Sequence, residues 1–554
     1  MKSRANFLSK LVFGFGSGNA DGHAGIASLL GGKGANLAEM SSVGIPVPPG
    51  FTISTEVCRY FFENEFQYPS ALGKSITKAL SKIELETERQ FGDPTNPLLV
   101  SVRSGSRFSM PGMMDTILNL GLNAETVAGL AATAGSERFA WDSYRRFIQN
   151  YSHVVFGLDN TLFDVLIDHK KKERSILFDS DLTAEDLKLI VKDFKNLLDE
   201  RFNQAFPEDP NTQLYGAISA VFRSWKSPRA SKYRQIHNIP EDWGTAVNVQ
   251  AMVFGNISEK SATGVAFTRN PSNGQKTLYG EFLVNSQGED VVSGARTPRA
   301  LTRSGRAKRD SDLASMEELM PAVFEELREV QERLELHFKD MQDIEFTVEE
   351  GRLWILQTRS GERSSEASIR IAVDMANEGL ITREEAVTRV APSVLNQFIN
   401  PIVNPKCDHL LLGKGLPASP GAVSGAIIFD ADEAVTLAEK GQDIILVRTE
   451  TSPTDIHGIH AARGILTTTG GMTSHAAVVA RGMGRPCVTG AADVFVDYKN
   501  QVLVAGQWEV KAGEPITIDG SDGQIYLGTA PTIYPIVSDH VTCLMSWANT
   551  IQKC

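Results

Sequence analysis

His475 stands in a setting that could support phosphoryl transfer. It follows a glycine pair and a Thr-Ser step in the stretch TTTGGMTSHAAVVARGMGRPCV, residues 467–488. Thr473 or Ser474 can cap a helix that begins at the histidine, and Gly482 can end it. The free N–H groups and the positive dipole end of a helix N-terminus favour an anion, and a neutral imidazole is a nucleophile. Taken alone, the stretch also fits an ordinary histidine that is hydrogen-bonded to backbone at a helix start.

A second group of polar residues lies in the segment DIEFTVEEGRLWILQTR, which begins at Asp343 and predicts two strands joined around Gly351. Asp343 and Glu345 are two positions apart and therefore share one strand face. Gln357 and Arg359 share a face of the return strand in the same way. If the loop has an odd number of residues centred on Gly351, all four side chains line one patch. Carboxylates beside a guanidinium suit Mg²⁺ and nucleotide phosphates, and a solvated hairpin with cross-strand ion pairs is the alternative.

The elements that must position these residues predict a chain of mixed α and β structure with several domains. A length of 554 residues corresponds to roughly three to four domains. Residues 125–240 have helical periodicity, whereas the segments on either side contain strand-like runs and glycine-rich loops. Residues 363–410 are helical and polar, and residues 411–532 alternate small residues with short apolar runs, as in a compact α/β domain.

Composition and charge narrow the class of protein. Apolar content of 42% and charged content of 22% are typical of a globular protein with an ample core. A net charge of −12 argues against a nucleic-acid partner, although an acidic enzyme can bind ATP through a local basic pocket. Five cysteines without CxxC spacing favour a reducing compartment and argue against a zinc site. No apolar run is long enough to cross a bilayer, and the start MKSRANFLSKLVF lacks a signal-peptide pattern. A cytoplasmic protein without a membrane partner is therefore expected, with a transit peptide as the alternative.

The order of several longer motifs is similar to that of one enzyme family. The chain contains, in this order, GGKGANLAEM, VPPGFTI, SVRSGSRFSMPGMMDTILNLGLN, YRRFIQNY, GTAVNVQAMVFGN, GVAFTRNPSNG, QGEDVV, DIEFTVEEGRLWILQTR and GGMTSHAAVVARGMG. Through these motifs nearly the whole chain resembles the amino-terminal two-thirds of the pyruvate, phosphate dikinase family. The resemblance implies an ATP-grasp-like nucleotide-binding domain over residues 1–362, with a helical insertion at about 125–240. It further implies a helical linker over 363–410, a swivelling α/β phosphohistidine domain over 411–532, and a stub at 533–554 that leads to a barrel domain.

The resemblance also implies a reaction and a set of site residues. His475 would accept the β-phosphoryl group of ATP with release of AMP, and the pyrophospho-histidine would pass its terminal phosphoryl group to inorganic phosphate. Asp343 and Glu345 would hold Mg²⁺, and the loop from Ser109 to Met113 would close over the phosphates. The implied nucleotide- and phosphate-binding residues are Lys33, Arg103, Arg146, Gln250, Glu289, Gln357 and Arg359.

Three positions bear on whether the chain can carry out the whole reaction that the resemblance implies. Thr473 matches a residue that is phosphorylated for regulation in some relatives, and helix capping is the simpler role. Thr469 stands where the family usually has arginine, so the charge at His475 is expected to be less well stabilised. The chain ends at Cys554, before the family's barrel for pyruvate or phosphoenolpyruvate. We therefore expect ATP and phosphate as direct partners, and pyruvate or phosphoenolpyruvate only through a separate barrel or a homologous subunit, with a homodimer as one form. The alternative is a catalytically idle protein that binds nucleotide or other subunits.

Overall fold

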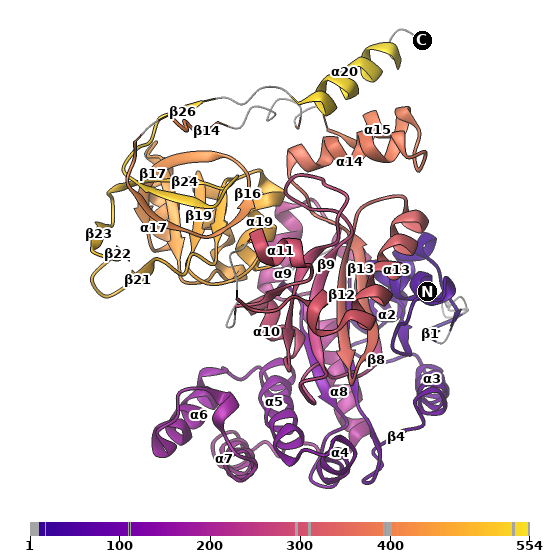
Figure 1. Ribbon diagram of the computed structural model, residues 1–554. Helices are drawn as coiled ribbons and strands as arrows, with labels where there is room; N and C mark the ends of the chain where they lie inside the picture. The colour runs from indigo at the N-terminus through magenta and orange to yellow at the C-terminus, as the bar shows by residue number, and fades with distance from the viewer. Residues whose placement is uncertain are drawn as a thin grey trace. The chain divides into compact units, whose positions relative to one another are not determined.

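Figure 1 shows the computed structural model of the chain. The chain divides into two compact units. The first comprises Met1–Ile257 and Trp354–Gln357, and the second comprises Ser258–Leu353 and Thr358–Cys554. Within them the structure describes residues 10–16, 18–108, 110, 112–293, 297–308, 312–391, 394, 401–406, 408–533 and 538–551. Two residues of the loop predicted to close over phosphates, Ser109 and Pro111, lie outside the described residues, as does Cys554.

The first unit is built on an antiparallel sheet of six strands in the order β2-β1-β3-β8-β6-β7. In that order the strands are Asn19–Ala20, Val12–Gly16, Gly50–Ile53, Ala246–Ala251, Val100–Gly105 and Thr116–Leu120. Phe13 packs with helix α1 (Ala27–Ser42), whereas its neighbour Val12 belongs to the core that includes helix α3 (Leu72–Thr87). Consecutive strand residues point to opposite faces, so α1 and α3 cover opposite faces of this sheet.

Helices make up most of residues 126–236, in agreement with the periodicity of this stretch. They are α4 (Thr126–Ala134), α5 (Glu137–Phe156), α6 (Thr161–Arg174), α7 (Ala184–Phe202), α8 (Pro210–Ser224) and α9 (Pro228–Ile236). Ser136, Asp209 and Ser227 cap α5, α8 and α9 with their side chains, and Thr183 begins α7 with a capping box. The buried faces of α5, α7 and α8 join α2 (Thr55–Glu63) and α3 in one core on the sheet.

A second sheet, in the order β11-β10-β9-β12-β13, belongs mainly to the second unit. In that order its strands are Arg299–Ala300, Tyr279–Val284, Ala262–Phe267, Gln342–Glu349 and Arg352–Ser360. The accompanying helices are α10 (Gly288–Ser293), α11 (Arg303–Lys308), α12 (Met316–Leu319) and α13 (Pro321–Phe338). Strands β12 and β13 are joined by a two-residue turn, Glu350–Gly351, with φ of 50° and 81°. The expected odd-numbered loop centred on Gly351 is therefore wrong, because two residues with positive φ form the tight turn that matches strand twist.

A third sheet has eight strands in the order β15-β25-β24-β17-β18-β19-β20-β16. In that order they are Leu411–Lys414, Gln524–Leu527, Pro515–Asp519, Ala422–Ile428, Ile444–Arg448, Gly464–Thr467, Cys487–Thr489 and Leu416–Ser419. The central strands β17 to β20 are parallel and connected by the helices α17 (Ala431–Glu439), α18 (Ile456–Ala461) and α19 (His475–Met483). These helices pack on one face of the sheet. The small sheet of β21 (Phe495–Asp497), β22 (Val502–Ala505) and β23 (Trp508–Lys511) packs on the other.

Three further helices of the second unit pack together: α14 (Ser365–Asn377), α15 (Arg383–Arg389) and α20 (Asp539–Ile551) (Figure 1). The short strands β14 (Ile402–Val403) and β26 (Thr532–Ile533) pair with each other. Among the described residues, no helix combines the length and apolar character that a membrane crossing requires. The predicted fold class, α/β and α+β in several domains, is confirmed.

Candidate functional site

His475 is the first residue of helix α19, as the glycine-rich approach predicts. The cap is Ser474, whose backbone is extended and whose Oγ accepts a hydrogen bond from the N–H of Ala477. The prediction that Thr473 caps the helix is therefore wrong. The helix also continues through Gly482, where it was expected to stop, and ends at Gly484, whose φ of 62° suits a helix end that only glycine adopts readily.

The His475 ring is half-buried and held at one of its two nitrogens. Its Nδ1 lies 3.3 Å from the hydroxyl oxygen of Thr451, at the end of the loop that follows β18. Burial lowers the pKa of His475, and the nearby carboxylate of Asp455 opposes this only in part. Burial therefore favours the neutral imidazole, and in the tautomer whose Nδ1–H donates to the Thr451 hydroxyl oxygen the lone pair lies on Nε2.

The loop before His475 is attached to strand β10 by a buried carboxylate. Glu281, which is fully buried, accepts a hydrogen bond of 3.2 Å from the N–H of Met472 and one of 3.4 Å from the hydroxyl of Thr473. A Cβ atom on Gly471 would lie 2.1 Å from the Glu281 carboxylate, so this approach requires glycine. Thr473, the candidate for modification, is thus mostly buried in this arrangement.

A buried arginine connects α19 with the sheet that carries Asp343. Arg481 donates hydrogen bonds to the carbonyls of Met472 and Ala418, and its guanidinium lies 5.7 Å from the centre of the Phe267 ring. It also interacts electrostatically with Glu281 and Asp343. Sequence reasoning missed both Glu281 and Arg481. Only the position of an arginine inside the apolar run HAAVVAR could have drawn attention to Arg481.

The predicted metal-binding carboxylates lie on β12, beside an arginine of β13. Arg359 donates from Nε to Oδ2 of Asp343 at 2.8 Å, while Thr358 and Gln342 hydrogen-bond to each other through their side chains. Because neighbouring strand residues alternate, Asp343 and Arg359 share the other face of the hairpin. Glu345 interacts electrostatically with both.

The Asp343 carboxylate has an oxygen that a cation could satisfy. It is buried, and within the described part of the chain no donor reaches its Oδ1. Burial raises the pKa of Asp343, Glu345 adds to this, and Arg359 opposes it. No cluster of three or more metal-binding side chains occurs among the described residues. Two carboxylates are nevertheless enough for Mg²⁺, which keeps water and phosphate oxygens as its remaining ligands. Asp343 and Glu345 therefore fit a Mg²⁺–phosphate site.

Three of the predicted nucleotide-binding residues belong to one side of the six-stranded sheet. Arg103 lies on β6 and Gln250 on β8, each next to valines that pack into the α3-side core, so both face the α1 side. Lys33 lies on α1 itself, which covers that side. The Gln250 side chain is buried and donates to the carbonyl of Pro48 at 3.1 Å, which fixes its amide.

The remaining predicted residues are placed as follows. Arg146 lies on α5 and pairs with Asp142, whose Oδ2 accepts from its Nε at 3.0 Å. Gln357 lies on β13, and Glu289 lies in α10, where its side chain is outside the described part. The hydroxyl of Thr469, at the position where the resemblance leads us to expect arginine, donates to the carbonyl of Thr449 at 2.8 Å.

Two family models match the chain in sequence order. The first is described as "Pyruvate phosphate dikinase, AMP/ATP-binding domain" and matches residues 27–68, 65–309 and 302–380, which is more than half of the chain. The second is described as "PEP-utilising enzyme, mobile domain" and matches residues 440–523, the part that includes His475.

Curated proteins of the same description align with nearly the whole chain. It is 53% identical over 546 residues to the pyruvate, phosphate dikinase of Rhizobium meliloti (strain 1021), covering 99% of this chain and 61% of the relative. It is 50% identical over 548 residues to that of Clostridium symbiosum, with coverages of 98% and 61%. It is 51% identical over 547 residues to the chloroplastic pyruvate, phosphate dikinase of Flaveria pringlei, covering 98% of this chain and 56% of the relative. The chain thus spans about three-fifths of the length of these relatives.

Proposed function

The chain belongs to the pyruvate phosphate dikinase family, and we propose that it transfers the β-phosphoryl group of ATP to His475, releasing AMP, and then passes the terminal phosphoryl group to inorganic phosphate. The full reaction we propose for the enzyme is ATP, pyruvate and phosphate to AMP, phosphoenolpyruvate and pyrophosphate. The observation that carries this proposal is the neutral, half-buried imidazole of His475, held at Nδ1 by Thr451. A ring held at Nδ1, with its lone pair on Nε2, is suited to act as a nucleophile.

In the proposed first step, Nε2 of His475 attacks the β-phosphorus of ATP. A bond forms between nitrogen and phosphorus, the bridging bond between the α- and β-phosphates breaks, and its electron pair leaves on AMP. The lowered pKa of His475 keeps the attacking lone pair available at neutral pH. An oxygen of inorganic phosphate then attacks the γ-phosphorus, which releases pyrophosphate and leaves one phosphoryl group on the histidine.

Charge neutralisation is the other requirement of phosphoryl transfer. We assign Asp343 and Glu345 as the residues that would hold Mg²⁺, which neutralises phosphate charge when it is bound. Arg359 keeps the Asp343 carboxylate oriented through its 2.8 Å hydrogen bond. We assign phosphate and nucleotide contacts to the cations and amides predicted from the resemblance: Lys33, Arg103, Arg146, Gln250, Glu289, Gln357 and Arg359.

The experiment that tests this function follows the two phosphates of ATP separately. With [β-³²P]ATP and Mg²⁺ the protein should become labelled, and added phosphate should not remove that label. With [γ-³²P]ATP the protein should also become labelled, and added phosphate should move the label into pyrophosphate. Binding of ATP without either label would instead support the idle nucleotide-binding protein.

Stabilisation by Mg²⁺ and ATP is expected to depend on pH through Asp343. A ligand at about 100 times its dissociation constant stabilises a fold by about 2.7 kcal/mol. The pKa of Asp343 is higher in the folded protein than in the unfolded chain, so the burial penalty grows as pH rises and the carboxylate ionises. Only the ionised carboxylate binds the metal. The increase in thermal midpoint caused by Mg²⁺ and ATP should therefore grow as pH rises from about 5 to 8.

Asp343→Asn should lose most of this increase and its pH dependence, because an amide carries no charge for the cation. Glu349→Gln, at the far end of the same strand, is the matched control and should behave like the wild type. The same pH dependence in Asp343→Asn as in the wild type would show that another group holds the metal. Differential scanning calorimetry at several pH values gives both quantities.

A further inference from the structure

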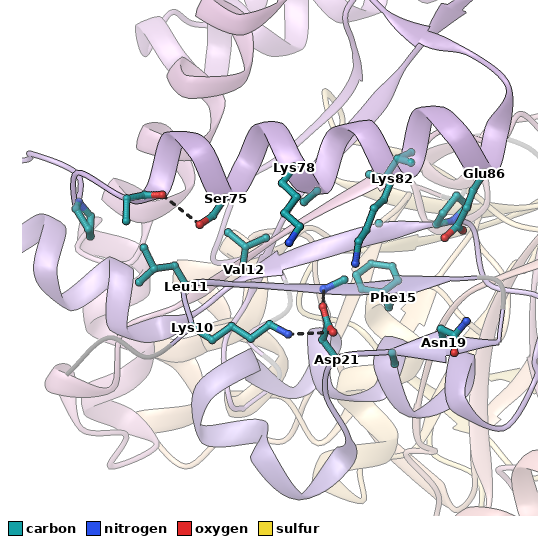
Figure 2. Close-up of a pocket in the computed structure, with 18 of the residues that line it drawn as sticks. Lys10, Leu11, Val12, Phe15, Asn19, Asp21, Ser75, Lys78, Lys82 and Glu86 are labelled. Carbon is teal, nitrogen blue, oxygen red and sulfur yellow. Dashed lines mark hydrogen bonds and ion pairs between the residues drawn. The ribbon is translucent and has the colours of Figure 1, made fainter. Parts of the chain in front are cut away.

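A groove of about 1130 Å³ runs along the first unit between helix α3 and the strands β1 and β2 (Figure 2). Its floor contains the apolar residues Leu11 and Val12, and the buried Ile83 lines the groove from α3 itself. Figure 2 shows Lys78 and Lys82 extending from α3 toward β1. The groove therefore combines an apolar floor with a cationic wall.

The helix side of the groove presents two lysines, Lys78 and Lys82, one helical turn apart. Lys78 and Lys82 are four residues apart on α3, so they lie on the same helix face and repel each other. The salt bridges of the described residues include the Lys10–Asp21 pair of this groove but none from Lys78 or Lys82. On a chain with a net charge of −12, two adjacent cations over a groove mark a local site for an anion.

The strand side of the groove adds a third lysine, held in place by Asp21. Lys10 lies 2.9 Å from Oδ1 of Asp21, and the N–H of Gly14 donates to Oδ2 at 2.8 Å. Burial acts to raise the pKa of Asp21, but Lys10, Gly14 and the charge of Lys82 together lower it. Lys82 is thus close enough to act on Asp21 from the opposite wall. Asp21 is already satisfied by Lys10 and Gly14, which leaves Lys78 and Lys82 for a ligand.

This groove is separate from the nucleotide site assigned above. Val12 lines the groove and belongs to the α3-side core, whereas Lys33 lies on α1 and Arg103 faces α1. Since α1 and α3 cover opposite faces of the six-stranded sheet, the two sites cannot share a ligand.

We propose that the groove binds a small phosphate monoester, with its phosphate between Lys78, Lys82 and Lys10 and its apolar part over Leu11 and Val12. A phosphate dianion offers three acceptor oxygens to the ammonium groups, and hydrogen bonds between ionised partners are the strong ones. The remaining carboxylate of the groove, Glu86, lies one turn beyond Lys82 on α3, so the lysines dominate the end near Lys78. The floor favours a ligand with an apolar body over bare phosphate.

The test uses phenyl phosphate as the probe and inorganic phosphate as its counterpart without an apolar part. A ligand-observed NMR titration should show saturable binding of phenyl phosphate to the full chain, and inorganic phosphate should displace it only at a concentration about tenfold or more higher. Lys78→Gln combined with Lys82→Gln should weaken binding at least about tenfold. Lys74→Gln, on the same helix but outside the groove, should leave it unchanged.

Saturating ATP and Mg²⁺ should not displace the probe, and His475→Asn should bind it like the wild type. The groove is thereby tested independently of phosphoryl transfer to the histidine. Absence of saturable binding, equal affinity in the double variant, or displacement of the probe by ATP would each overturn the proposal.

Discussion

Replacement of His475 by asparagine is expected to abolish labelling of the protein by [β-³²P]ATP, because the amide has no lone pair basic enough to attack phosphorus. In the wild type the label should be lost in acid and retained in base, as expected of a phosphorus–nitrogen bond. The variant should still be stabilised by Mg²⁺ and ATP, since His475 is not among the residues assigned to nucleotide binding. Autoradiography of the acid- and base-treated protein, beside calorimetry, measures both.

Thr451→Val is expected to have a smaller effect on labelling than His475→Asn. It removes the hydroxyl at Nδ1 without touching the imidazole, so labelling should slow by a few-fold to about tenfold. Persistence of the same acid-labile label in His475→Asn would place the phosphoryl acceptor elsewhere. An unchanged rate in Thr451→Val would show that the contact does not position the ring.

Arg269→Met is expected to cause a large loss of stability in the second unit, about 3–5 kcal/mol. The Arg269 side chain is fully buried, and its guanidinium donates to Glu335 and, at 2.8 Å, to Glu378. Removal of the cation leaves Glu335 buried without its charged partner. Lys276→Met is the matched control, because Lys276 also pairs with Glu378 but is 54% exposed. It should cost at most about 1 kcal/mol.

The pH dependence of stability separates this network from simple loss of packing. Burial acts to raise the pKa of Glu378, but Arg269 and Lys276 together lower it below its usual value of 4.5. A carboxyl with a lowered folded pKa contributes stability above its unfolded pKa and loses it as pH falls. Denaturant unfolding should therefore show a shallower loss of stability below about pH 4.5 in Arg269→Met than in the wild type. An equally steep acid limb would mean that Arg269 stabilises by packing alone.

The sequence predicts the helix start and the strand pairing at the site better than it predicts the turn and the helix end. The start of α19 at His475 follows from the glycine pair and the Ser474 cap, because these are local signals. The pairing of Asp343 with Arg359 agrees with the two-residue period of strands, although the turn at Glu350–Gly351 differs from the loop expected. The helix end was misplaced by two residues, since either glycine could terminate α19 and tertiary packing decided between them.

What the sequence could not predict are contacts between segments far apart in the chain. Glu281 reaches a loop that is about 190 residues away along the sequence, and no spacing rule connects the two. Arg269 likewise meets Glu335 and Glu378 only because the fold brings their elements together. Buried polar groups of this kind obey the requirement for a partner, but which partner is a property of the tertiary structure.

The backbone amide of Met472 donates a hydrogen bond to Glu281, so its hydrogen exchange can measure how often the loop before His475 separates from β10. Its acceptor is a side chain of another strand, so deuterium cannot replace this hydrogen until the loop separates from β10. Exchange of most helical amides reports fraying or unfolding of the helix itself. The exchange rate of Met472 instead reports how often the segment that carries His475 detaches from the sheet, on a timescale that ordinary thermal displacements do not sample.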